Sequence, residues 1–128
     1  MRSLYDTNFV IRLINADAIA EQASAGVEQA FVNVTVIGEL LVGQHLTRDP
    51  AAVRIGIAAI RRQVGVMAID EATADFYATI YAQLRSIEQL IPENDMSIAA
   101  TAMRHDLTLL TFDRDFDRVA GLNKIIYR

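Results

Sequence analysis

The chain has 128 residues, 52% of them hydrophobic, which is enough to bury one substantial core and too short for two domains. It has no cysteine, which excludes disulfides, thiolate nucleophiles and zinc–sulfur sites. Its formal net charge is −4, no apolar run approaches the ~18 residues that span a bilayer, and Asp6 comes too early for a secretory signal. We therefore expect a single domain over residues 1–128, in the cytoplasm and without a membrane partner.

The first half of the chain predicts two strands, each followed by two helices. Aromatic and β-branched residues mark the second strand, and Gly26 ends the helix before it. Pro50 fits the first turn of a helix, where its missing N–H is not needed. The expected elements are a strand at 3–5, helices at 9–14 and 17–25, a strand at 30–34, a helix at 35–45 with Thr35 as its N-cap, and a helix at 51–63.

The second half predicts three further strands and two helices. The clearest helix covers residues 71–89, because Phe76, Ile80, Leu84 and Ile87 recur at spacings of three and four. The helix after it is rich in small residues, which allows close packing on a sheet. The expected elements are a strand at 64–69, a helix at 71–89, a helix capped by Asn94 and reaching about residue 105, and strands at 107–111 and 124–127.

The alternation of strands and helices indicates a parallel sheet that is covered on both faces. The expected fold is α/β, a three-layer sandwich with a central, mostly parallel sheet of four to five strands flanked by helices.

Four carboxylates occupy positions where such a sheet binds ligands. Asp6 follows the first strand, Asp113 follows the fourth, and Asp95 opens a helix. In open α/β sheets ligands bind outside the carboxyl ends of the strands, where the strand order reverses. If the first and fourth strands are neighbours, Asp6 and Asp113 meet there, and Glu39 could reach the same crevice from the helix after the second strand.

Carboxylates gathered at one point repel and raise one another's pKa, so the arrangement calls for a cation. Hard oxygen ligands suit Mg²⁺ or Mn²⁺. A cation of this kind can lower the pKa of a bound water and neutralise charge on a phosphate. The four acids therefore favour a metal site for phosphodiester cleavage.

Each acid also has a simpler interpretation as a helix cap or a partner of the helix dipole. A capping box does not explain Glu39, because Gly38 stands three residues after Thr35. A calcium loop beginning at Asp113 is rejected, because its sixth and twelfth positions hold Arg118 and Lys124 instead of Gly and Glu.

Four stretches of sequence resemble the motifs of PIN domains, in the same order. Leu4-Tyr5-Asp6-Thr7-Asn8 resembles their opening, and Val36-Ile37-Gly38-Glu39-Leu40 resembles the helix that carries their second acid. The stretch from Pro92 to Ala102 resembles the third motif, and that from Leu109 to Phe116 resembles the fourth. The resemblance runs from residue 3 to the end of the chain and is strongest to the VapC-like toxins of toxin–antitoxin pairs.

This resemblance implies a Mg²⁺- or Mn²⁺-dependent endoribonuclease that acts on tRNA or another structured RNA, forms a homodimer and is inhibited by a cognate antitoxin. Asp6 and Asp95 would be the primary metal ligands, and Glu39 and Asp113 would complete the cluster, with Asp115 as the alternative to Asp113. The residues that would support these acids by hydrogen bonds are Thr7, Asn8 and Thr111.

Two other functions compete with this one. A phosphoacceptor receiver domain is also a small α/β sandwich with an acidic Mg²⁺ pocket, and Asp70 after the third strand would suit it. It further needs adjacent acids after strand one and a lysine after its last strand, whereas Lys124 precedes the final strand. The second competitor is a catalytically inactive PIN fold that binds RNA or a protein partner, but such a fold has no need of four mutually repelling acids.

Overall fold

The central element is the strand β1 (Arg2–Tyr5), which has a parallel partner on each side. The computed structural model describes all 128 residues. It contains one five-stranded sheet in the order β3-β2-β1-β4-β5, in which every neighbouring pair is parallel. The other strands are β2 (Gln29–Asn33), β3 (Gly65–Met67), β4 (Thr108–Thr111) and β5 (Lys124–Ile126).

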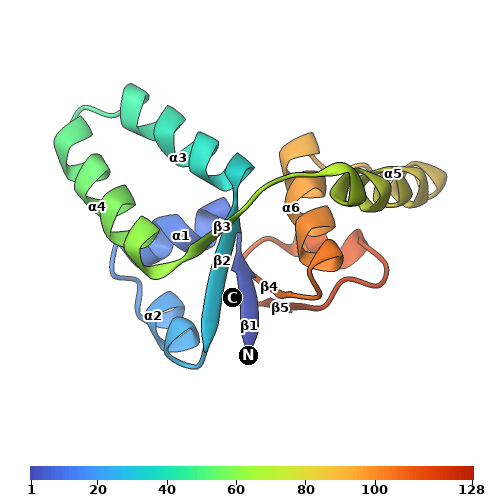
Figure 1. Cartoon of the computed structure of the whole chain (residues 1–128), viewed down its shortest axis with the longest axis horizontal. Helices are drawn as coiled ribbons and strands as arrows, with labels where there is room; N and C mark the ends of the chain where they lie inside the picture. Colours follow the sequence, from blue (N-terminus) through green and yellow to red (C-terminus); the bar gives the residue numbers. More distant parts are fainter.

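Helices cover both faces of this sheet, which confirms the predicted α/β sandwich. Figure 1 shows α1, α2 and α4 on one side of the strands and α5 and α6 on the other, while α3 begins at the carboxyl end of β2. The helices are α1 (Thr7–Ile14), α2 (Ala18–Ala25), α3 (Val34–Leu46), α4 (Pro50–Gln63), α5 (Glu71–Ser86) and α6 (Glu93–Arg104), with a short 3₁₀ helix, η1 (Arg114–Arg118), between β4 and β5.

The sheet reverses its order at β1, and this decides where a ligand can bind. The chain builds β1, β2 and β3 in one direction and then places β4 and β5 on the opposite side of β1. Tyr5 is paired with Leu110, so Asp6, which directly follows β1, lies beside Thr111, the last residue of β4. The expectation that the first and fourth strands are neighbours is therefore confirmed.

The core is formed by 25 buried hydrophobic residues on the strands and on the inner faces of the helices. Leu4, Leu109 and Leu110 are fully buried in the two strands that flank the reversal point. Ala99, Ala100 and Ala102 of α6 are also fully buried, as the small residues in that helix predicted. No helix is both long and apolar enough to cross a membrane.

Three predicted helix starts are wrong, each for a local reason. α3 is capped by Asn33 rather than Thr35, because the buried Asn33 side chain accepts a hydrogen bond from the Val36 N–H at 3.0 Å. Asn94 lies inside the first turn of α6, whose N-cap is Pro92 and has no side-chain hydrogen bond. α1 begins at Thr7, earlier than predicted, because Asp6 caps it.

Two other boundaries also differ. β3 has only three residues because it is an edge strand, paired with β2 alone over Phe31–Asn33. α5 ends at Ser86, before the end of the apolar repeat that predicted its continuation to residue 89.

We predict that Asn33→Ala destabilises the fold by about 2–4 kcal/mol, because it removes a helix cap, leaves the buried Val36 N–H without its partner and takes one of two hydrogen bonds from Thr101 Oγ1. The Asn33 side chain also donates to Thr101 Oγ1 at 3.1 Å and so connects β2 with α6. The measurement is urea denaturation. Asp49→Ala is the matched control, since Asp49 is an exposed cap that bonds only Ala52 N–H; it should cost about 1 kcal/mol. Equal losses in the two variants would contradict the connecting role of Asn33.

Candidate active site

Four acids from four different elements line one pocket at the reversal point of the sheet. The pocket has a volume of about 270 Å³ and eight lining residues, none of them hydrophobic: Asp6, Thr7, Asn8, Glu39, Pro92, Asn94, Asp95 and Asp113. Seven of these residues are polar, and no Arg, Lys or His is among them. The structure thus brings together the four acids that the sequence singled out.

Asp6 is the most firmly held of the four acids. It is 4% exposed, and one carboxylate oxygen caps α1 by accepting the Phe9 N–H at 2.9 Å. The other oxygen accepts a hydrogen bond from the Thr111 hydroxyl at the end of β4. Burial is the main cause of a raised Asp6 pKa; these two hydrogen bonds oppose it, and the charges of Asp113 and Glu39 raise it further.

Glu39 reaches the pocket from the second turn of α3. Its Oε1 accepts a hydrogen bond from the Thr7 hydroxyl at 2.7 Å, which links α3 to the start of α1. Glu39 has the buried apolar residues Val36, Ile37 and Leu40 as neighbours in the helix, where an acid without a hydrogen-bond partner would be unfavourable. Thr7 is that partner.

Asp95 lies in the first turn of α6 and makes no side-chain hydrogen bond there. Its pKa is raised from 3.8 to about 6, first by burial and then by the negative charges of Asp113, Asp6 and Glu39. The N-terminal end of a helix normally favours a carboxylate, so burial and repulsion outweigh that effect here.

Asp113, rather than Asp115, lies in the pocket. Asp113 caps η1 by accepting the Asp115 N–H at 2.8 Å, and its own N–H donates to Thr111 Oγ1 at 2.9 Å. Asp115 forms an ion pair with Arg118 at 3.3 Å and does not line the pocket. Asp113 is therefore the acid that both caps η1 and lines the pocket.

Of the three predicted supporting residues, two hold an acid directly. Thr7 binds Glu39, and Thr111 connects Asp6 with the backbone of Asp113. Asn8 is exposed and lines the pocket but makes no hydrogen bond with an acid.

A polar network that no sequence motif predicted fixes α3 against α6. Asn33 donates to Thr101 Oγ1 at 3.1 Å and to Ser97 Oγ at 3.3 Å, and Thr35 and Ser97 hydroxyls lie 3.1 Å apart. The network sets the position of the helix bearing Glu39 relative to the helix bearing Asp95. The available signal was the four-residue spacing of Ser97 and Thr101, which places two hydroxyls on one face of a helix.

The acids share a pocket without forming a closed cage. No group of three or more Asp, Glu or His side chains lies close enough to hold a metal ion. Mutual repulsion keeps like charges apart, and Thr7 and Thr111 hold two of the acids in place. All of these donors are oxygens, which are the ligands that suit a hard divalent cation.

Comparison with known proteins identifies relatives of the same size. The sequence model of the PIN domain matches residues 4–122. The curated protein ribonuclease VapC4 of Mycobacterium tuberculosis is 34% identical over 117 residues, which are 90% of this chain and 88% of that protein.

Solved structures share the whole architecture. The VapBC2 complex of Rickettsia felis, bound to a DNA fragment from its promoter, contains a chain with a TM-score of 0.90, 18% identity and complete coverage of both chains. VapC20 of Mycobacterium tuberculosis, described as a toxin that cleaves the sarcin–ricin loop, gives a TM-score of 0.71 at 25% identity and covers 97% of this chain and 98% of its own.

We predict that Asp95→Asn raises the free energy of unfolding in EDTA by about 1 kcal/mol, because it removes one of the four negative charges in the pocket. In a domain of this size the melting temperature should then rise by a few degrees. The pKa of Asp95 is raised on folding, so the folded state retains the proton more strongly. Stability should therefore fall as pH rises from about 4 to about 6 and stay low above it. The stability of Asp95→Asn should fall less over this pH interval, because asparagine does not titrate.

Thermal denaturation of both proteins in EDTA at several pH values is the measurement. Asp75→Asn is the matched control, because Asp75 is an exposed acid on α5 without an ion pair. If Asp95→Asn melts below the parent at pH 8, Asp95 acts mainly by favouring its helix N-terminus.

Proposed function

This chain belongs to the PIN-domain family, and from that premise we propose that it is an endoribonuclease that cleaves RNA phosphodiester bonds at the four-acid pocket. The observation that carries the proposal is the convergence of four acids from four elements into one polar pocket that contains no cationic side chain. The acids are Asp6, Glu39, Asp95 and Asp113. Unrelated helix caps would have no reason to meet there. The name of the 34% identical relative, a ribonuclease, supports the same activity.

We propose Mg²⁺ or Mn²⁺ as the cofactor, held by Asp6 and Asp95, with Glu39 and Asp113 as further ligands or as acceptors for its waters. When bound, the cation would lower the pKa of a water molecule and neutralise charge developing on the phosphate. The raised pKa of Asp6 and of Asp95 supports this assignment, since a cation would offset the unfavourable charge of both.

The surrounding residues would act by orienting the acids. The Thr111 hydroxyl directs one Asp6 oxygen, and the Phe9 N–H directs the other, so this carboxylate has one fixed orientation. Thr7 does the same for Glu39. Asn8, at the pocket rim, is available to donate to a substrate oxygen.

We further propose that the chain is the toxin of a toxin–antitoxin pair, active as a homodimer and inhibited by a cognate antitoxin. The VapBC complexes among the structural neighbours support this role. A groove of about 260 Å³ between α1, α3 and α4 adds a local argument. Five of its nine lining residues are hydrophobic, and Glu39, which also lines the acidic pocket, is one of the remaining four. An apolar partner segment in this groove would reach the rim of the acidic pocket.

The receiver-domain alternative is disfavoured by two contacts. Asp70 caps α5 by accepting the Thr73 N–H at 2.9 Å and pairs with Arg104 at 3.7 Å, so it does not join the pocket. Lys124 pairs with Asp117 at 3.8 Å, away from the four acids. An inactive PIN fold would be expected to lack at least one of the acids, and this chain has all four.

Asp6→Asn should reduce RNA cleavage by at least 100-fold while keeping the fold, because the amide removes the charge but retains an acceptor for Phe9 N–H and can donate to Thr111. Asp6→Ala would also remove the helix cap and is less informative. The assay incubates purified protein with total RNA, with and without Mn²⁺, and maps the new RNA ends by sequencing. Cleavage equal to that of the parent would show that the site is elsewhere.

Asp113→Asn should weaken cleavage at limiting Mn²⁺ more than Asp115→Asn, because only Asp113 lines the pocket and Asp115 is occupied by Arg118. The asparagine at 113 can still accept the Asp115 N–H, so η1 keeps its cap. The measurement is the Mn²⁺ concentration for half-maximal cleavage. A larger increase for Asp115→Asn would reverse the assignment of the fourth acid.

A further inference from the structure

Two further pockets continue from the acidic pocket along the β4–η1–β5 side of the molecule. The second is lined by Asn8, Ile11, Arg12, Phe112, Asp113 and Arg114, so it shares Asn8 and Asp113 with the acidic pocket. The third lies between η1 and β5 and shares Arg114 with the second. The three pockets therefore lie next to one another on the surface, each sharing at least one lining residue with the next.

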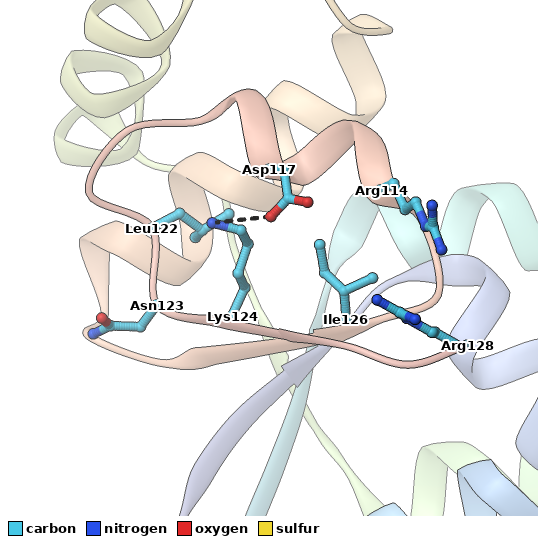
Figure 2. A pocket seen from close by; sticks show the side chains of 7 residues that line it. All are labelled: Arg114, Asp117, Leu122, Asn123, Lys124, Ile126 and Arg128. Atoms are coloured by element: carbon cyan, nitrogen blue, oxygen red, sulfur yellow. Dashed lines mark ion pairs between the residues drawn. The ribbon is translucent and has the colours of Figure 1, made fainter.

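The charge changes sign along this surface. The acidic pocket contains four carboxylates and no cation. The third pocket, which has a volume of about 560 Å³, contains Arg114, Lys124 and Arg128 against the single acid Asp117. In Figure 2, Arg114 and Arg128 lie at one end of this pocket and Asn123 and Lys124 at the other. In a chain with a net charge of −4, this gathering of cations is a local feature that the overall charge hides.

The cations differ in how far their charge is already neutralised. Lys124 is paired with Asp117, and Arg12 is paired with Asp17 at 3.4 Å while its guanidinium stacks on Phe112 at 3.9 Å. Arg114 and Arg128 are exposed and form no ion pair. These two arginines are therefore free to bind an external anion, and the guanidinium fork suits a phosphate.

We propose that the three pockets form a path for an RNA strand, with the scissile phosphate at the four acids and neighbouring phosphates on Arg114 and Arg128. The inference rests on the proposed ribonuclease function and assigns a binding surface to it. Arg12 lies along the middle of the path, but its charge is already paired with Asp17, so the phosphate contacts fall to Arg114 and Arg128. An RNA strand carries further phosphates on either side of the bond that is cleaved, and these would meet Arg114 and Arg128 beside the acidic pocket.

The test measures binding of a fluorescent single-stranded RNA oligonucleotide to the full chain in EDTA, so that cleavage does not enter. Each neutralised phosphate contributes about 0.7 to the slope of log K against log salt for single strands. The double variant Arg114→Gln/Arg128→Gln should therefore lower the slope by about 1.4 and weaken binding about 50-fold near 50 mM salt.

Two control variants isolate the effect. Arg114→Lys/Arg128→Lys retains both charges and should keep a slope close to that of the parent. Arg61→Gln/Arg62→Gln removes two exposed arginines of α4 that lie outside the three pockets and form no ion pair, and it should leave binding unchanged. Circular dichroism verifies that each variant is folded.

Three results would contradict the proposed RNA path. The first is an unchanged salt slope of RNA binding in the Arg114→Gln/Arg128→Gln variant. This result would count against the path even if the parent protein cleaves RNA, so the inference can fail while the proposed function holds. An equal loss in the Arg61/Arg62 control would show that binding depends only on net charge. If poly-L-glutamate at the same charge concentration displaces the RNA as well as unlabelled RNA does, the surface is one for acidic protein segments instead.

Discussion

The arrangement of the site depends on one buried carboxylate at the junction of β1 and β4. Asp6 is almost fully buried, and both of its oxygens are occupied, one by the first turn of α1 and one by Thr111 at the end of β4. Thr111 in turn accepts the Asp113 N–H. A single side chain thus fixes a helix, a neighbouring strand and the loop that carries another acid. The register of Tyr5 with Leu110 makes this contact possible, since it brings both strand ends to the same level.

The fold offsets the unfavourable charge of the pocket through contacts outside it. Burial, and after it repulsion by the neighbouring acids, raises the pKa of Asp95 to about 6, so its charge opposes the folded state at neutral pH. The Asn33, Ser97 and Thr101 network holds α3 against α6, and the fully buried alanines of α6 pack that helix against the body of the protein. Stability and activity are consequently separated in space, as in many enzymes whose sites carry strain.

The same chain also separates its charges. Acids occupy the carboxyl ends of β1 and β4, whereas Arg114, Lys124 and Arg128 line the neighbouring pocket between η1 and β5. Acids at the proposed cleavage point suit a cation, and arginines beside it suit phosphates. A polyanionic substrate needs both, so an acidic protein can bind RNA when its charges are arranged in this way.

The sequence by itself determined the strand–helix alternation, the α/β class and three of the acids, Asp6, Glu39 and Asp95, because hydrophobic periodicity and the position of a residue at the end of an element are local signals. It could not decide between Asp113 and Asp115, and it assigned the caps of α3 and α6 to Thr35 and Asn94. Those choices depend on which side chain faces a neighbouring element, and only packing determines that. The pairing of β1 with β4, the bond between Thr7 and Glu39, and the cationic pockets beside the acids likewise join residues far apart in the chain. No local pattern encodes such contacts, because their free energy comes from surfaces that meet only in the folded molecule.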